Sequence, residues 1–246
     1  MGIIHGLRIV ADMARLAAPS LVDAARGRLE RHDIDERARW FARRVVDTLE
    51  VNLVVSGGAQ VSPGETYVYM SNHQSHLDIP MLYATLPSPT IRMLGKTELF
   101  RFPLWGPLLR AAEFIEVDRS NPTTARASLR RAAELVRDGV CVYLAPEGTR
   151  SRDGRINPLK KGGFHLALAT GAPIVPVAIR GTIDILPRGA RVPATGKIVH
   201  VHLGDPIAVG GRTVADLSAE VEAFLRLHVE GRVDLAVHRP VNGRPP

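Results

Sequence analysis

The chain has 246 residues, of which 45% are apolar, and this is enough to bury one sizeable core. Its formal charge of +7 indicates a phosphate-bearing partner, either nucleic acid, an anionic membrane or a small phosphorylated substrate. Nucleic acid is the least supported of these, because only 5% of residues are aromatic and no known reader motif is present. The single cysteine, Cys141, excludes an internal disulfide framework and favours a reducing compartment.

Residues 3–22 are predicted to form an amphipathic helix, bent near Pro19. Apolar residues recur on one face (Ile3, Leu7, Val10, Ala14, Ala17 and Leu21) and polar residues on the other (His5, Arg8, Asp12 and Arg15). A second helix is predicted after the acidic start at residues 33–36, and periodicity alone is satisfied if both helices pack on the core. Since no run of about 18 apolar residues and no secretory cleavage pattern is present, we expect the chain to stay on the cytoplasmic side.

From residue 51 the pattern changes to short β-type runs that alternate with helices. The expected strands are residues 51–55, 67–71, 114–118, 140–144, 174–179 and 198–203. The clearest helix between them is residues 122–137, with Asn121 as its cap and Pro122 in its first turn. This alternation predicts an α/β fold with a central, mostly buried sheet flanked by helices. The tail, residues 231–246, is expected to be flexible.

His73 and Asp78 lie directly after the predicted strand 67–71 and before a helix opened by Pro80. Residues at strand ends of α/β sheets face the usual ligand crevice. A histidine there can act as a general base, and a carboxylate bound to its other ring nitrogen would fix the tautomer. On a continuous helix the two side chains would lie roughly 140° apart. They can therefore meet only if the chain turns between them.

Three other interpretations of this segment remain open. Asp78 can simply cap the following helix, which leaves His73 as an ordinary loop residue. His73, His76 and Asp78 are also metal-ligand types, although no further cluster at ligand spacing supports a metal site. Ser75 is the weakest candidate, because no Gly-x-Ser-x-Gly elbow surrounds it as a nucleophile would require.

A second polar segment, residues 145–151, follows the predicted strand 140–144. Gly148 lets the backbone approach a ligand closely, and Thr149, Arg150 and Ser151 offer donors suited to phosphate. The alternative is a surface turn with solvated charges.

Two further features have plainer explanations. The arginines of helix 122–137 share one face with Glu134 and are interpreted as a solvated face (Arg126, Arg130 and Arg137). Cys141 adjoins nothing cationic in the sequence, so we expect an inert strand residue and no acyl-cysteine intermediate.

The two polar segments together resemble motifs of the lysophosphatidic acid acyltransferases and, more broadly, the glycerolipid acyltransferase family. His73 and Asp78 match the family's His-x4-Asp catalytic motif, and residues 146–151 match its acceptor-binding motif. Residues 96–106, 114–119 and 174–179 resemble three further blocks, and the order of the five argues against coincidence. In one departure, Glu113 and two alanines precede the aromatic residue where the family usually has a glycine, so the local turn is in question.

The resemblance implies transfer of a fatty acyl group from acyl-CoA or acyl carrier protein to the free sn-2 hydroxyl of lysophosphatidic acid. His73 would be the base and Asp78 would orient it, with no acyl-enzyme, metal or other cofactor. Backbone amides near Gly148 would stabilise the oxyanion. The implied substrate-binding residues are Lys96, Arg119, Glu147, Gly148, Thr149 and Arg150.

The resemblance also implies that residues 1–50 dock in one membrane leaflet, which gives a peripheral or monotopic protein on the cytoplasmic face. Residues 51–230 would then form the acyltransferase domain. The acceptor could instead be another lysophospholipid, glycerol 3-phosphate or an amino-lipid. An alternative from another class is a non-catalytic lipid- or membrane-binding module whose basic surface docks on anionic headgroups.

Overall fold

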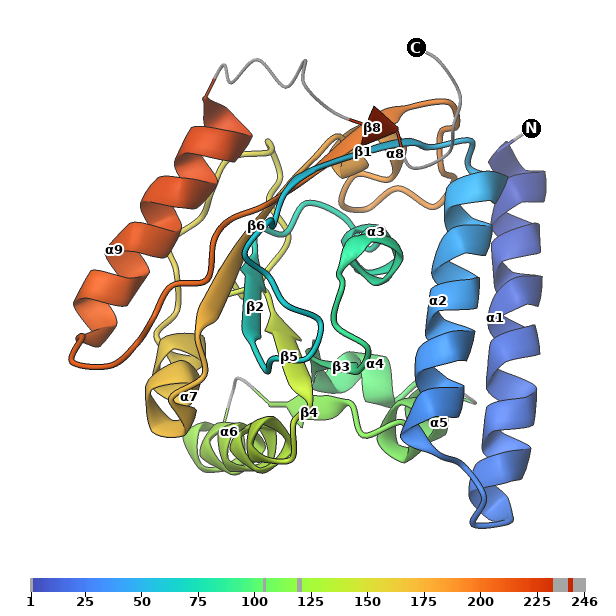
Figure 1. Cartoon of the computed structure of the whole chain (residues 1–246). Coiled ribbons are helices and arrows are strands. Elements are labelled where there is room, and N and C mark those ends of the chain that lie inside the picture. Colours follow the sequence, from blue (N-terminus) through green and yellow to red (C-terminus); the bar gives the residue numbers. More distant parts are fainter. Residues whose placement is uncertain (1, 104, 119–120, 232–238, 241–246) are drawn as a thin grey trace.

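The computed structural model describes residues 2–103, 105–118, 121–231 and 239–240. Two N-terminal helices, α1 (Gly2–Ala25) and α2 (Arg31–Thr48), lie side by side and precede a sheet flanked by helices (Figure 1). The strands are β1 (Asn52–Gly57), β2 (Val68–Ser71), β3 (Ile91–Lys96), β4 (Ile115–Val117), β5 (Cys141–Leu144), β6 (Ile174–Arg180), β7 (Ile198–Leu203) and β8 (Arg239–Pro240). The remaining helices are α3 (Asp78–Thr85), α4 (Thr97–Phe100), α5 (Trp105–Ala111), α6 (Pro122–Arg137), α7 (Gly162–Thr170), α8 (Thr182–Ile185) and α9 (Val214–Leu225), which a π-helical turn (Arg226–Glu230) follows.

The described part of the chain forms one sheet of eight strands in the order β4-β3-β5-β2-β6-β7-β1-β8. β4, β3, β5, β2 and β6 run parallel, so their carboxyl ends meet at one edge of the sheet. β7 runs antiparallel to β6, and β8 runs antiparallel to β1. Each of the six predicted strands is present, and the predicted α/β fold with a central sheet flanked by helices is confirmed.

The two faces of the sheet carry two separate apolar cores. Tyr67 and Tyr69 point into the core covered by α2 and α3, whereas Val68 and Met70 point into the core covered by α6, α7 and α9 (Figure 1). Successive side chains of a strand alternate between faces, so a strand covered on both sides must be apolar throughout. This explains why the central strands read as continuous apolar runs.

β3 was not among the strands predicted from the sequence, because Arg92 interrupts its apolar residues directly after Ile91. Arg92 is buried and donates to the Asp35 carboxylate of α2 at 2.5 Å, so this charge pair ties the N-terminal helices to the sheet. The analysis also missed β8, which lies in the predicted flexible tail. Apart from β8 and Gly231, that tail falls outside the described residues, and the domain boundaries stay a prediction.

α1 turns an apolar row of side chains outward instead of packing that row on the core. The helix continues through Pro19 without the predicted bend, and Asp12 from the polar face is buried against Arg15 and Arg44. An apolar row instead faces outward, and we call it the α1 stripe (Ile3, Leu7, Val10, Ala14, Ala18 and Val22). No helix in the described ranges is long and apolar enough to cross a membrane.

The turn after α5 keeps a glycine-like conformation without a glycine. Glu113 has φ of 61°, in the left-handed region that favours glycine. Its carboxylate accepts from Arg31 at 2.6 and 2.9 Å and from Arg131 at 3.4 Å, and these bonds offset the backbone cost. The hydrogen bond from Arg31 lowers the pKa of Glu113, although burial opposes the shift. The departure from the family pattern therefore leaves the left-handed turn in place.

Candidate active site

At the end of β2 the main chain leaves the sheet at Asn72. Its side-chain amide donates to the Ile179 carbonyl at 2.8 Å and accepts from the Ile179 amide at 2.8 Å. A side-chain amide carries the same donor and acceptor as a peptide group, so it extends the pairing of β2 with β6 while the main chain turns away. The residues that follow, 72–77, form the His73 loop at the carboxyl edge of the sheet.

The turn of the His73 loop brings His73 and Asp78 together. The fully buried Asp78 carboxylate binds His73 through Oδ2, which lies 2.7 Å from Nδ1. The same oxygen accepts from the amides of Gln74 at 2.8 Å and Ser75 at 3.0 Å, while Oδ1 accepts from the Thr182 hydroxyl at 2.5 Å. Asp78 is therefore no simple helix cap, because its oxygens bind groups that precede α3 or come from α8.

This geometry fixes the tautomer of His73. A carboxylate can only accept, so Nδ1 carries the proton and Nε2 keeps its lone pair. Nε2 has no hydrogen-bond partner among the described residues, and the His73 side chain is 21% exposed. The four hydrogen bonds to Asp78 compensate the burial of its charge. The pair can thus take a proton from a ligand at Nε2 while Asp78 stabilises the resulting imidazolium.

Glu147 joins the His73 loop to the second polar segment, residues 145–151, which we call the Glu147 loop. Its carboxylate is 2% exposed and accepts from the His73 amide at 2.7 Å and from the amide and side chain of Asn157 at 2.8 Å each. Burial raises the pKa of Glu147, and these hydrogen bonds oppose the shift. In return, the Ser151 amide donates to the His73 carbonyl at 2.7 Å. Both oxygens of Glu147 serve the protein, which favours its positioning of the loop over contact with a ligand.

The other residues of the Glu147 loop remain available to a ligand to different degrees. Gly148 has φ of 72°, and its amide donates to Ala145 within a turn. The amides of Thr149 and Arg150 have no hydrogen-bond partner in the described part of the chain. Burial lowers the pKa of the half-buried Arg150, and the nearby charge of Arg188 adds to this shift. The candidate oxyanion donors near Gly148 are therefore the backbone amides of Thr149 and Arg150.

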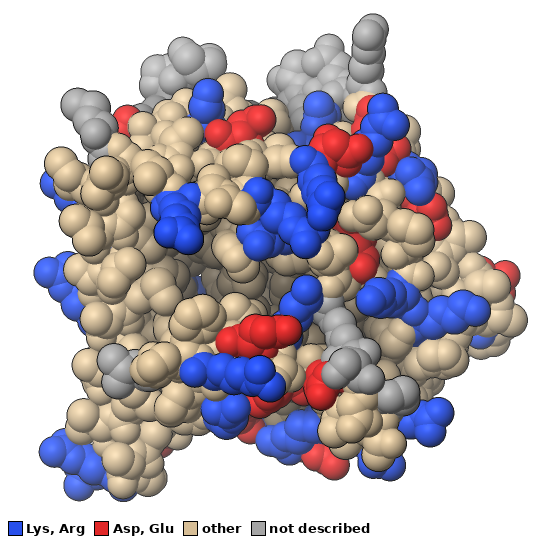
Figure 2. Space-filling view, turned by 180° about the vertical axis from the view of Figure 1, so that it is seen from behind, with Lys and Arg blue, Asp and Glu red and all other residues tan. Residues whose placement is uncertain are grey.

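The remaining predicted phosphate ligands lie toward β3 and β4. Lys96 is exposed at the carboxyl end of β3, which pairs with β5 next to the strand that leads to His73. Arg119 lies outside the described residues. The face turned away in Figure 1 is hollowed near its centre, and lysines and arginines gather around the hollow (Figure 2).

Sequence reasoning missed a third wall of the site, residues 182–193, which we call the Arg188 segment. Thr182 binds Asp78, and the Ser75 hydroxyl donates to the Leu186 carbonyl at 2.8 Å. Ser75 is thus engaged as a structural donor and is not poised as a nucleophile. Arg188 is exposed beside Arg150. This wall could have been predicted from the sequence, because residues 182–193 carry cations and directly follow the strand 174–179. That strand ends at the same edge of the sheet as the strand before His73.

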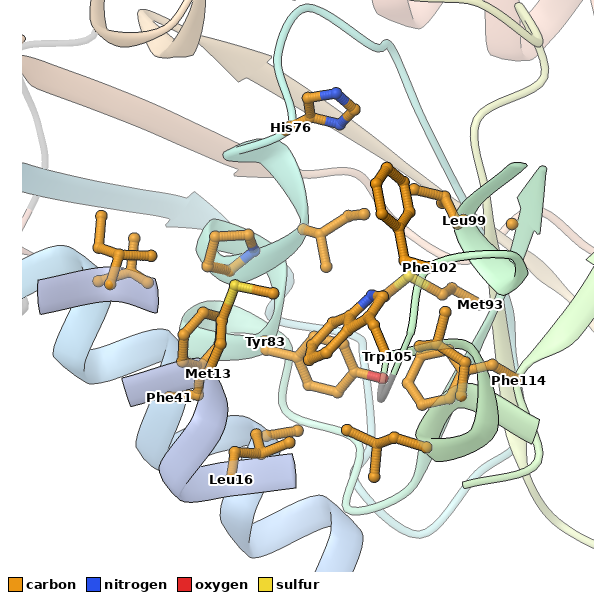
Figure 3. Close-up of a pocket in the computed structure, with 18 of the residues that line it drawn as sticks. Met13, Leu16, Phe41, His76, Tyr83, Met93, Leu99, Phe102, Trp105 and Phe114 are labelled. Carbon is orange, nitrogen blue, oxygen red and sulfur yellow. The ribbon is translucent and has the colours of Figure 1, made fainter. Parts of the chain in front are cut away.

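An apolar cavity of about 610 Å³ begins beside the His73 loop. Figure 3 shows His76 at one end and Leu16 of α1 at the other, with Phe41 of α2, Tyr83 of α3 and Trp105 of α5 between them. These residues range from Leu16 to Trp105 in the sequence, which is why the cavity was not predicted from local patterns. Its shape and lining suit a hydrocarbon chain.

Two further candidates are a metal site and the thiol of Cys141. The described residues hold no group of three His, Cys, Asp or Glu side chains that could bind a metal ion. Cys141 is buried and accepts from the Tyr67 amide at 3.3 Å, and burial raises the pKa of its thiol. A thiol held in its neutral form is a poor nucleophile, in line with the expected inert strand residue.

Comparison with known proteins relates this arrangement to enzymes of lipid synthesis. The family described as Acyltransferase matches residues 52–180. A 1-acyl-sn-glycerol-3-phosphate acyltransferase from Haemophilus influenzae is 31% identical over 188 residues, which is 74% of this chain and 75% of that protein. A chloroplastic protein of the same name from Brassica napus is 39% identical over 57% of this chain, but the chain spans only 40% of its length.

One solved structure has a similar fold over nearly the whole chain. It is the crystal structure of the 1-acyl-sn-glycerophosphate acyltransferase PlsC from Thermotoga maritima. The two chains share a TM-score of 0.77 and 26% identity, with 94% of this chain and 97% of that chain covered. The likeness therefore includes the N-terminal helices as well as the sheet.

Proposed function

The chain belongs to the acyltransferase family, and we propose that it transfers a fatty acyl group from a thioester donor to the sn-2 hydroxyl of 1-acyl-glycerol 3-phosphate. The observation that carries this proposal is the hydrogen bond between His73 Nδ1 and the buried Asp78, which leaves Nε2 as a base in a loop whose His76 and Leu77 line an apolar cavity. The named relatives act on the same acceptor, and the product would be phosphatidic acid.

In the proposed reaction, His73 Nε2 takes the proton of the acceptor hydroxyl as its oxygen attacks the thioester carbonyl. The tetrahedral oxyanion forms within reach of the free amides of Thr149 and Arg150. Collapse of this intermediate breaks the carbon–sulfur bond, and the departing thiolate takes the proton back from the imidazolium. Asp78 stabilises that imidazolium, and no acyl-enzyme is formed.

The acceptor phosphate would bind to the cations that face the His73 loop. Arg188 lies close enough to Arg150 to contribute to the lowered pKa of Arg150, and a dianion between the two would offset this repulsion. Lys96 and Arg119 are further ligands that we propose from the motif resemblance. Glu147 would act through the position of the His73 backbone.

The apolar cavity would hold an acyl chain, at about 0.8 kcal/mol for each buried CH₂. The inner face of α1 forms one of its walls, while the α1 stripe on the outer face exposes Leu7 by 65% and Val10 by 62%. Exposed Val192 contacts the start of α1 and extends this apolar surface. We therefore propose that the protein lies peripherally on a membrane through the α1 stripe, beside which the cavity can receive a lipid chain.

The proposal is tested with purified full-length protein, a labelled acyl thioester and a panel of acceptors. The panel contains 1-acyl-glycerol 3-phosphate, glycerol 3-phosphate, a lysophospholipid with a zwitterionic headgroup and an amino-lipid. We expect the first to be preferred, and R150A and R188A to raise its KM about ten- to hundredfold. The donor KM should change little, and R212A is the control, because Arg212 precedes α9 and pairs with Glu220.

The panel also separates the alternatives. Equal use of all acceptors would contradict phosphate recognition. A rise confined to the donor KM would reassign Arg150 and Arg188 to phosphates of the donor. Lipid binding without transfer to any acceptor would favour a non-catalytic binding module.

A further inference from the structure

A second, shallow cavity lies between α6 and α7, away from the His73 loop. Its volume is about 410 Å³, and we call it the α6–α7 groove. Leu129, Ala133 and Leu166 give it an apolar floor. Its rim carries exposed basic side chains from both helices (Arg126, Arg130, Arg137 and His165). An apolar floor between basic rims is the complement of an amphipathic helix with acidic edges.

Two arginines of the rim lack an acidic partner in the described part of the chain. Arg126 and Arg130 form no ion pair among the described residues, and Glu134 on the rim is paired with Arg131 at 3.1 Å. Residues 119–161 together carry ten Lys and Arg against four Asp and Glu. The excess charge of the chain is therefore concentrated on this part of the fold.

The groove leads to the active site. Gly162, at the start of α7, lies against Leu129 of α6, since a Cβ built on it would stand 3.6 Å from the Leu129 side chain. The exposed Lys160 and Lys161 therefore lie at this end of the groove, and the Lys160 amide donates to the Pro146 carbonyl of the Glu147 loop at 2.8 Å. A partner in the groove would contact the edge of the loop that positions His73.

The position of the groove favours a soluble partner over a lipid surface. In Figure 1, α6 and α7 lie at the lower left and α1 lies at the right, although the C-terminal end of α6 reaches Arg31 of α2 through Asp138 at 3.7 Å. The α1 stripe and the α6–α7 groove share no residue, so a bilayer that contacts the stripe leaves the groove to a separate partner. A separate macromolecule that docks beside the Glu147 loop has a chemical reason to do so if it carries one of the two substrates.

We propose that the α6–α7 groove docks a small acidic protein that carries the acyl group as a thioester on a flexible arm, as acyl carrier protein does. This inference rests on the proposed acyl transfer and names its donor. The acyl chain would enter the apolar cavity, and the thiolate would leave on the carrier arm. Arg126 and Arg130 would then determine the affinity for the donor and take no part in the chemical step.

The test compares two donors that carry the same acyl chain, one on acyl carrier protein and one on coenzyme A. In R126A/R130A we expect the KM for the protein donor to rise about tenfold, with a smaller rise at high salt. The KM for acyl-CoA and kcat with either donor should stay unchanged. The control is R212A/R226A, which removes two ion-paired arginines beside and on α9, one partly buried and one exposed, and should affect neither donor.

Three results would overturn the docking surface: an unchanged KM for the protein donor in R126A/R130A, wild-type protein that uses acyl-CoA alone, or an equal rise for both donors. Loss of binding to anionic vesicles in R126A/R130A, with donor kinetics intact, would identify a lipid surface instead. If the wild type transfers from neither donor, the proposed function fails. Calorimetric titration of the full chain with acyl carrier protein then still decides the groove, since absence of binding contradicts it.

Discussion

The His73 loop and the wall of the apolar cavity are neighbouring regions built on opposite principles. The loop is held by short hydrogen bonds among buried polar groups, four of them to Asp78 alone. The cavity wall is held by apolar packing of segments that have no local relation, from α1 to α5. In the loop the loss of one donor leaves a buried charge unsatisfied, whereas the wall tolerates changes of shape. In the proposed function, the catalytic geometry would thus be fixed in one region and chain selection adjustable in the next.

The largest expected effect comes from breaking the polar side of this comparison. H73A removes the base and D78N removes the acceptor that fixes its tautomer, so each should lower kcat about 10²- to 10⁴-fold. Thermal unfolding of both variants should show that the fold remains. Turnover near wild type in folded H73A protein would disprove the general-base role. Chelator treatment of the wild type should change nothing, and a loss of activity after chelation that zinc restores would favour a metal site instead.

The outer face of α1 gives the next largest effect. L7N/V10N should weaken binding to vesicles about hundredfold or more, because burying each apolar side chain contributes about 1.5 to 3 kcal/mol. Both side chains are exposed, so stability should not change. I198N/L227N makes the same chemical change at two other exposed positions and serves as the control. Equal loss of vesicle binding in both variants would show that the α1 stripe is not the docking face.

The adjustable side of the comparison is tested by A38F, which places a ring in the cavity from α2. Each CH₂ that loses its place costs about 0.8 kcal/mol, or roughly fourfold in kcat/KM. The preferred acyl chain should therefore become shorter, while a four-carbon donor reacts as before. The measurement is kcat/KM across a series of chain lengths. An equal loss at every length would mean that the ring disturbs the His73 loop and not the acyl site.

The smallest expected effect is the pH dependence due to Glu147. Its pKa is raised above the ordinary 4.5, so the native chain binds this proton more tightly than the unfolded chain. The stability that the protonated group contributes is complete below pH 4.5 and is lost as pH rises through the raised pKa. The stability of wild type relative to E147Q should thus fall over that window, by about 1.4 kcal/mol for each pH unit that separates the pKa of the native chain from that of the unfolded chain. Urea unfolding at several pH values checks this, and a constant difference would contradict it.

The two regions also differ in how far the sequence predicts them. His73, Asp78 and the Glu147 loop follow strands whose apolar runs are visible, so their meeting at one edge could be expected. The strand around Arg92 was missed because its charge is satisfied by Asp35, a partner 57 residues away. The roles of Thr182 and Leu186 depend on hydrogen bonds over more than 100 residues, to which no local pattern responds. The cavity cannot be predicted from the sequence for the same reason, because the local pattern of each lining residue is that of a residue in the hydrophobic core.

One consequence of α1 concerns the path of the lipid. The helix presents Met13 and Leu16 to the cavity and Leu7 and Val10 to the outside. One face would therefore contact the bound acyl chain and the other the hydrocarbon of the membrane. A helix with its side chains is about 10 to 12 Å thick. On a docked protein, a bound acyl chain and the chains of the bilayer would therefore be separated by one helix diameter. A lipid product could leave around the end of α1 into the leaflet without exposing its hydrocarbon to water, and the helix would act as a partition between solvent-free compartments.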